Sequence, residues 1–221
     1  MKRIIKSTAL ILGILLLFAS CSGVESDVTT TASNDTTSEL VQPGIEYGSE
    51  TVSDGEHPQV KFTMKDGGSF IIELYPEYAP QTVDNFIKLV SDGFYDGLTF
   101  HRVIDDFMAQ GGDPDGTGMG GSKDRIFGEF AQNGFRQNTL SHTRGVVSMA
   151  RTSNDFNSAS SQFFICYGDE TFLDGSYAAF GKVIKGMEVV DSFLETERTI
   201  GADGNKSVPV EPIVIEKAEV L

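Results

Sequence analysis

Hydrophobic and polar residues alternate along the chain after residue 56 in the manner of β-strands. Residues 60–64 alternate strictly, residues 65–68 have the composition of a turn, and residues 70–74 form a second β-rich run. Two such runs around a short polar turn predict a β-hairpin. Further β-rich runs predict strands at 98–104, 145–150, 162–167, 178–184 and 213–220.

Two segments carry a helical period instead. The first opens at Pro80 and ends at Gly93, and the second spans about 187–194. Their apolar stripes are Val83, Phe86, Ile87 and Val90 in the first, and Met187, Val190 and Leu194 in the second. Many strands with two helices, and no regular βαβ alternation, predict a mainly β fold: an antiparallel barrel or sandwich capped by helices.

A glycine-rich stretch at 111–121 raises the question of phosphate binding. It lacks the Lys-Ser/Thr pair of a P-loop and does not lie between a strand and a helix. We therefore expect a surface loop with several positive-φ turns.

The first twenty residues have the pattern of a signal peptide. Three basic residues lie within the first six positions, and residues 9–19 form an apolar run interrupted only by Gly13. That run is far shorter than the about 20 residues needed to span a bilayer. We expect residues 1–20 to be removed on export.

The residues that follow predict a lipid anchor and a tether. Phe18-Ala19-Ser20-Cys21 resembles the lipobox of bacterial lipoprotein precursors, although Phe18 stands where Leu is usual; cleavage without lipidation of Cys21 is the alternative. Residues 21–56 contain eight acids and no Lys or Arg, so we expect them to be disordered. We expect an extracytoplasmic protein, lipid-anchored to a bacterial membrane, whose folded domain is 57–221.

Charge and composition exclude several functions. A formal net charge of −15 is unfavourable for binding nucleic acid or an anionic lipid surface, so the lipid itself would be the only membrane contact. The three histidines have no metal-ligand spacing, and there is no G-x-S-x-G elbow. Cys166 lies in an apolar run, which predicts a buried structural thiol. We expect no metal and no cofactor.

One segment, residues 100–113, carries a motif that is specific to a known family. Residues 100–113 read FHRVIDDFMAQGGD and resemble the cyclophilin signature F-H-R-x-I-x-x-F-M-x-Q-G-G-D. The blocks 148–150, 161–165, 172–175 and 180–183 follow in the family's order, and 79–86 also resembles it. The resemblance covers 58–221. It implies a closed eight-stranded antiparallel β-barrel capped by two helices, with peptidyl-prolyl cis-trans isomerase activity.

The resemblance also implies the site. Arg102, Gln110 and Phe107 would be catalytic, with Arg102 as the cation near the prolyl nitrogen. The substrate-binding residues would be His101, Met108, Ala150, Arg151, Gln162, Phe164, Phe172, Leu173 and Tyr177. For His101 a purely structural imidazole is the alternative.

Three of these residues depart from the family's common pattern. Phe172 stands where many members carry Trp, Tyr177 where they carry His, and Arg151 where Asn is common. Phe172 lacks an indole N–H, which predicts weak binding of cyclosporin-type macrocycles. Arg151 adds a cation at the pocket rim that would favour acidic substrates; the alternative is that its own acidic surroundings neutralise it.

The expected function is isomerisation of Xaa-Pro segments in exported or unfolded proteins, for which a monomer suffices. The alternative is a non-catalytic module that holds proline-containing segments, or a chaperone at the cell surface.

Overall fold

The first two strands form a hairpin whose alternate residues point into a shared core. In the computed structural model, which describes residues 57–221, β1 (Gln59–Met64) and β2 (Ser69–Leu74) alternate between buried and half-buried positions. Phe62 and Phe70 lie opposite each other, with stacked rings 5.1 Å apart. The alternation read from the sequence is therefore the inside–outside alternation of a strand with one core face.

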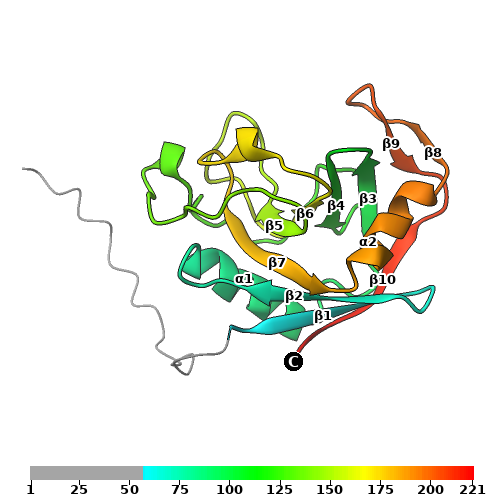
Figure 1. Cartoon of the computed structure of the whole chain (residues 1–221), viewed down its shortest axis with the longest axis horizontal. Helices are drawn as coiled ribbons and strands as arrows, with labels where there is room; N and C mark the ends of the chain where they lie inside the picture. The colour runs from blue at the N-terminus through cyan, green and yellow to red at the C-terminus, as the bar shows by residue number, and fades with distance from the viewer. Residues whose placement is uncertain (1–56) are drawn as a thin grey trace, which may run out of the picture. The chain divides into compact units, whose positions relative to one another are not determined.

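Eight strands close into an antiparallel barrel in the order β1-β10-β3-β4-β6-β5-β7-β2 (Figure 1). This confirms the predicted fold class and selects the barrel over the sandwich. The remaining barrel strands are β3 (Thr99–Ile104), β4 (Met108–Asp113), β5 (Val146–Met149), β6 (Phe163–Cys166), β7 (Ala179–Lys185) and β10 (Ile213–Val220).

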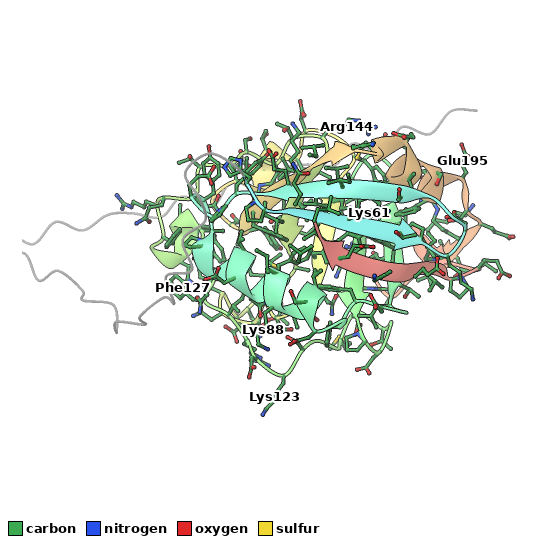
Figure 2. The ribbon with its side chains drawn as sticks, turned by 90° about the horizontal axis from the view of Figure 1, so that it is seen from below. Lys61, Lys88, Lys123, Phe127, Arg144 and Glu195 are labelled. Atoms are coloured by element: carbon green, nitrogen blue, oxygen red, sulfur yellow. The ribbon has the colours of Figure 1, made fainter. Side chains whose placement is uncertain are left out.

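Both predicted helices are present. In α1 (Pro80–Ser91), Phe86 enters the core and its ring centroid lies 4.9 Å from that of Phe180. Lys88 lies on the outer, exposed face of this helix (Figure 2). The second helix, α2 (Met187–Ser192), is shorter than predicted because the 3₁₀ turn Phe193–Glu195 follows it.

The N-terminus of α1 is capped from a distant segment. Its N-cap residue, Ala79, has no side-chain acceptor, but the buried carboxylate of Glu129 accepts the backbone N–H groups of Gln81 (3.0 Å) and Thr82 (2.8 Å). These are among the N–H groups that a helix cannot satisfy internally. Glu129 thus ties the segment just before the 3₁₀ turn Ala131–Asn133 to the helix α1.

Three strands were not predicted from the periodicity. β4 has the sequence MAQGGD, which is poor in β-branched residues, and β8 (Arg198–Ile200) and β9 (Lys206–Pro209) are short and polar. β8 and β9 form a two-stranded hairpin outside the barrel sheet. The glycine-rich loop after β4 has the predicted positive φ angles at Gly116 and Gly118, whereas 111–113 belong to the strand itself.

The predicted signal peptide, the lipidation site Cys21 and the tether 21–56 lie outside the described residues. Within 57–221, no helix combines the length and apolar character needed to cross a membrane.

Candidate active site

The candidate site lies on the outside of the barrel, where β6 carries apolar side chains on its outer face as well as on its inner face. Phe163 and Ile165 point inward to the main core, whereas Phe164 and Cys166 belong to a second apolar cluster on the outer face. Met108 from β4 and Leu173 from the 3₁₀ turn Thr171–Leu173 complete that cluster. An outer face that is apolar and covered only by loops leaves room for a surface pocket.

That outer cluster lines a small pocket of about 130 Å³. Met108, Phe164 and Leu173 are 1%, 5% and 7% exposed, so its lining is almost fully desolvated. Pockets for drug-sized ligands measure about 300–1,000 Å³, so this pocket by itself has the size for one small side chain. The residues around it are Arg102, Phe107, Met108, Gln110, Ala150, Arg151, Phe164, Leu173 and Tyr177.

Arg102 extends over this pocket from β3, and two acceptors hold its guanidinium. Nε donates to Oδ2 of Asp203 at 2.7 Å, and Nη1 donates to Oε1 of Gln110 at 3.2 Å. Nη1 also lies 3.9 Å from the sulfur of Met108 in the pocket lining. Within 57–221, Nη2 has no hydrogen-bond partner. A charged donor is therefore left available beside an apolar pocket.

A relay of amides continues from Arg102 across the barrel wall. Gln110 donates from Nε2 to Oε1 of Gln162 at 2.8 Å, and Gln162 donates to the carbonyl of Gly120 at 2.8 Å. The relay fixes the amide of Gln110 so that its oxygen faces the guanidinium. Four of the predicted site residues, Arg102, Met108, Gln110 and Gln162, are thus joined by direct contacts.

Comparisons with known proteins place the chain in a family. Residues 59–220 match the family model described as cyclophilin type peptidyl-prolyl cis-trans isomerase/CLD. The chain belongs to this family. It is a peptidyl-prolyl cis-trans isomerase.

Individual relatives cover the same region. The chain is 43% identical over 155 residues to the peptidyl-prolyl cis-trans isomerase ppi1 of Schizosaccharomyces pombe, covering 70% of this chain and 94% of the relative. It is 47% identical over 127 residues to isomerase B of Bacillus subtilis, covering 58% and 84%. A Cryptosporidium parvum cyclophilin solved in the presence of the dipeptide Ala-Pro has a TM-score of 0.64 and 30% identity, covering 74% of this chain and 98% of its own.

A second, larger hollow adjoins the first pocket of the cyclophilin domain. It measures about 370 Å³ and shares Gln110, Ala150 and Arg151 with the smaller pocket. Gln162, a predicted site residue, lines this larger hollow and not the smaller apolar pocket. The structure therefore places it beside the apolar pocket and not in its wall. Two of the shared residues, Ala150 and Arg151, directly follow the end of β5, so the two hollows lie on either side of this backbone.

Two aromatic side chains extend the apolar wall. Tyr177 stands at 85° to Phe164 with ring centroids 5.9 Å apart, inside the pocket lining. Phe172 is 70% exposed and stacks on Phe107 at 6.0 Å. Phe172 therefore lies on the rim and offers a bare ring to a bound chain.

Arg151 is engaged by the domain itself. Its guanidinium lies over the rings of Phe156 (4.9 Å) and Tyr177 (4.5 Å) and donates from Nη2 to the carbonyl of Ser176 at 2.9 Å. Its Nη1 donates to the carbonyl of Thr152 at 2.9 Å. Rings and carbonyls of the domain therefore hold this cation in place at the rim, and the expected preference for acidic substrates stays a prediction. Its position on the wall of both hollows is as predicted.

His101 does not line the apolar pocket. The register of β3 against β4 shifts between Phe100 and Arg102, so His101 has no residue opposite it, and such irregularities redirect side chains. The ring faces a separate hollow of about 250 Å³ beside the loop 116–118 and the β8–β9 hairpin. Among residues 57–221 its buried ring nitrogens have no well-formed hydrogen-bond partner, and the backbone of Thr99 is the acceptor that influences the ring. Burial lowers its pKa, although nearby Asp113 acts in the opposite direction.

A polar array that the sequence did not reveal lies next to Phe164 of the pocket lining: His142 and Ser148 are buried, and Asp174 is exposed. His142 contacts Oδ1 of Asp174 through Nδ1 (2.8 Å) and Oγ of Ser148 through Nε2 (3.0 Å), and its ring stacks on Phe164 at 6.0 Å. This is the connectivity of a hydrolytic triad, but Ser148 and His142 are fully buried and no substrate can reach the hydroxyl. Burial lowers the pKa of His142, although Asp174 acts in the opposite direction.

The remaining candidate chemistry is inert. Cys166 is fully buried, and burial raises the pKa of its thiol to about 12, as expected of a structural cysteine. Among residues 57–221, no group of three His, Cys, Asp or Glu side chains is placed to hold a metal ion.

Proposed function

We propose that this isomerase lowers the rotation barrier of Xaa-Pro bonds without covalent chemistry, using the Arg102 guanidinium beside the apolar pocket. The observation that supports the proposal is the pairing of an available Nη2 donor with a pocket sized for one small ring. The dipeptide Ala-Pro used with the Cryptosporidium relative is a ligand of this chemical type.

The reaction needs only a change in conjugation. Rotation about an amide faces a barrier of about 18–20 kcal/mol, because the nitrogen lone pair is shared with the carbonyl. The two isomers of an Xaa-Pro bond differ by only about 0.5–1 kcal/mol, so the enzyme must lower the barrier and not shift the equilibrium. In the rotated state the lone pair returns to the prolyl nitrogen, which then accepts a hydrogen bond. Arg102, always charged and carrying rigid donors, stabilises that state selectively.

The other site residues hold the substrate around this donor. Met108, Phe164 and Leu173 would contact the proline ring, with Phe107 and Phe172 extending the apolar surface. The backbone of Ala150 and Arg151 follows the end of β5, where it would pair with the residue before the proline. Gln110 would bond the substrate backbone while holding Arg102.

The test is the cis-to-trans rate of a short Ala-Xaa-Pro-Phe peptide with the wild-type domain and with Arg102→Ala and Arg102→Lys. Residues 57–221 suit this assay because they correspond to nearly the whole length of the Schizosaccharomyces relative. We expect Arg102→Ala to lose about 10²-fold in kcat/KM, as for other donors to a transition state. Arg102→Lys should recover little, since its donors have a different geometry.

Two outcomes would contradict the proposal. Full turnover by Arg102→Ala, with its fold intact by circular dichroism, would remove the arginine from the mechanism. A folded wild-type domain that binds the peptide without accelerating its isomerisation would favour the alternative, a module that only holds proline-containing segments.

We further propose that the clients are exported proteins and that the enzyme is anchored through lipidated Cys21. The support is sequence pattern: a signal-like start, small residues before Cys21 and an acidic tether. Mass spectrometry of the mature N-terminus and membrane fractionation of wild type and Cys21→Ser test this. We expect a diacylated cysteine and membrane association that Cys21→Ser abolishes; an unmodified N-terminus in the soluble fraction would overturn the anchor and leave the isomerase intact.

A further inference from the structure

Arg102 is paired with a carboxylate that lies 101 positions away in the sequence. Nε of Arg102 donates to Oδ2 of Asp203 at 2.7 Å, and both side chains are about one-quarter to one-third exposed. The other oxygen of Asp203 accepts from the backbone N–H of Asn205 (3.0 Å) and from Oγ of Ser207 (3.1 Å). The carboxylate is therefore held on both sides before any substrate binds.

Asp203 lies at the tip of the β8–β9 hairpin, which stands next to β3 (Figure 1). The tip is a tight turn: Gly201 donates its N–H to the carbonyl of Asn205 at 2.8 Å, and Gly204 donates to Gly201 at 3.0 Å. Gly204 has a φ of +78°, a conformation that favours glycine. This turn directs the Asp203 side chain inward, toward Arg102.

The base of the same hairpin is fixed to the same strand. Arg198 is 7% exposed, and its guanidinium donates to the carbonyl of Val103 at 3.1 Å and to Oδ1 of Asp105 at 2.7 Å. Val103 directly follows Arg102 in β3. The hairpin therefore contacts β3 at two points, through Arg198 at its base and Asp203 at its tip, and cannot easily shift relative to the arginine.

We propose that Asp203 is a positioning residue for catalysis, holding the Arg102 guanidinium so that Nη2 faces the prolyl nitrogen. A guanidinium is planar and offers five N–H donors in fixed directions. Asp203 accepts from Nε, and Gln110 accepts from Nη1. Because these two hydrogen bonds hold the guanidinium at two different nitrogens, they fix its plane and the direction in which Nη2 points. The inference rests on the proposed role of Arg102.

The pair stays charged under assay conditions. Partial burial opposes ionisation of Asp203, but the hydrogen bonds from Arg102, Asn205 and Ser207 outweigh it and lower its pKa to about 2. A carboxylate beside the guanidinium also reduces the net positive charge at the site. If Asp203 positions Arg102, removing its carboxylate should lower turnover. If Asp203 only reduces the positive charge at the site, removing it should raise turnover. Substitution of Asp203 therefore distinguishes the two effects.

The experiment compares the full chain in detergent with Asp203→Ala and Asp203→Asn. Asp203→Ala removes the acceptor, so kcat should fall about tenfold while KM for the peptide stays within about twofold, because the apolar pocket is untouched. Asp203→Asn keeps an oxygen that can accept from Nε and should recover much of kcat. Glu211→Gln, which removes an exposed carboxylate distant from the pocket, is the matched charge control and should match wild type.

A second readout does not depend on turnover. The chain has seven arginines, and the Arg102 Nε–H signal in a ¹H–¹⁵N spectrum can be assigned by its loss in Arg102→Lys. We expect slow exchange of this proton with water in wild type and fast exchange in Asp203→Ala. Turnover unchanged or increased in Asp203→Ala would overturn the positioning role, as would unchanged exchange. If Arg102→Ala itself retained full activity, the proposed mechanism would fail instead, whatever the exchange result.

Discussion

Phe163 and Phe164 are consecutive residues of β6, yet the first packs inside the barrel and the second lines the pocket on its outside. Strand geometry turns neighbouring side chains to opposite faces. One short strand therefore supplies both a central core residue and a wall of the candidate site. The stability of the fold and the binding of substrate are consequently separable at adjacent positions.

We predict opposite profiles for alanine substitutions at these two residues. Phe163→Ala should lower the free energy of unfolding by about 3–5 kcal/mol, since the cavity lies within a closed core. Phe164→Ala should cost about 2 kcal/mol, because its void opens to the pocket, and should raise KM about tenfold. Urea unfolding and the peptide assay measure both. Equal KM values for the two variants would contradict this assignment of faces.

How far the sequence predicts the fold depends on how regular each element is. The hairpin β1–β2 and the helix α1 follow from period alone, because each has one face in the core. β4 does not follow from periodicity, because its glycines lie where neighbouring segments approach the backbone too closely for a side chain. A Cβ at Gly112 would lie 2.5 Å from the carbonyl of Ser161. Barrel closure followed from the family resemblance and not from the pattern.

Some residues of the candidate site could be predicted from the sequence, and others could not. Arg102, Met108 and Gln110 lie in one motif on paired strands, so their proximity follows from the β3–β4 register. The register irregularity that turns His101 away leaves no sign in the residue types. Asp203 reaches Arg102 only because the barrel and hairpin bring distant segments together, and no local pattern could reveal that contact.

Acid should destabilise the domain through His142. Burial lowers the folded-state pKa below the ordinary 6.5, so only the unfolded chain takes up this proton as the pH first falls below about 6.5. Stability from this group is therefore present above that pH and lost below it. The free energy of unfolding should fall between pH 7.5 and pH 5.5, and His142→Gln should be less stable at pH 7.5 but flatter across this range.

His101 should contribute to the same pH dependence, because burial lowers its pKa as well. The effect of His142→Gln must therefore be compared with that of His101→Gln. His101→Gln should remove a separate part of the slope, and the double variant should be the flattest of all. Urea unfolding at the two pH values gives each difference. A full wild-type slope in His142→Gln would mean that this imidazole does not carry the effect.

Arg151 should contribute to stability and not to substrate charge preference. Arg151→Ala loses its ring contacts and carbonyl hydrogen bonds, and we expect a loss of about 1–3 kcal/mol in unfolding free energy. Arg151→Lys should recover little, because an ammonium cannot match the planar contacts. Peptides with Glu, Gln or Lys before the proline should differ little in kcat/KM; a strong preference for Glu that vanishes in Arg151→Ala would instead support the preference for acidic substrates expected from the sequence.

The exposed ring of Phe172 predicts weak inhibition by cyclosporin-type macrocycles. Phe172 contributes apolar surface at the rim but has no N–H to donate. Phe172→Trp adds that donor, and a hydrogen bond worth about 1 kcal/mol should tighten inhibition about fivefold. Phe172→Leu is the control, which keeps apolar area but removes the ring. Titration of peptide turnover with the macrocycle measures all three proteins; stoichiometric inhibition of wild type, or equal inhibition of wild type and Phe172→Trp, would show that this rim position does not set the affinity.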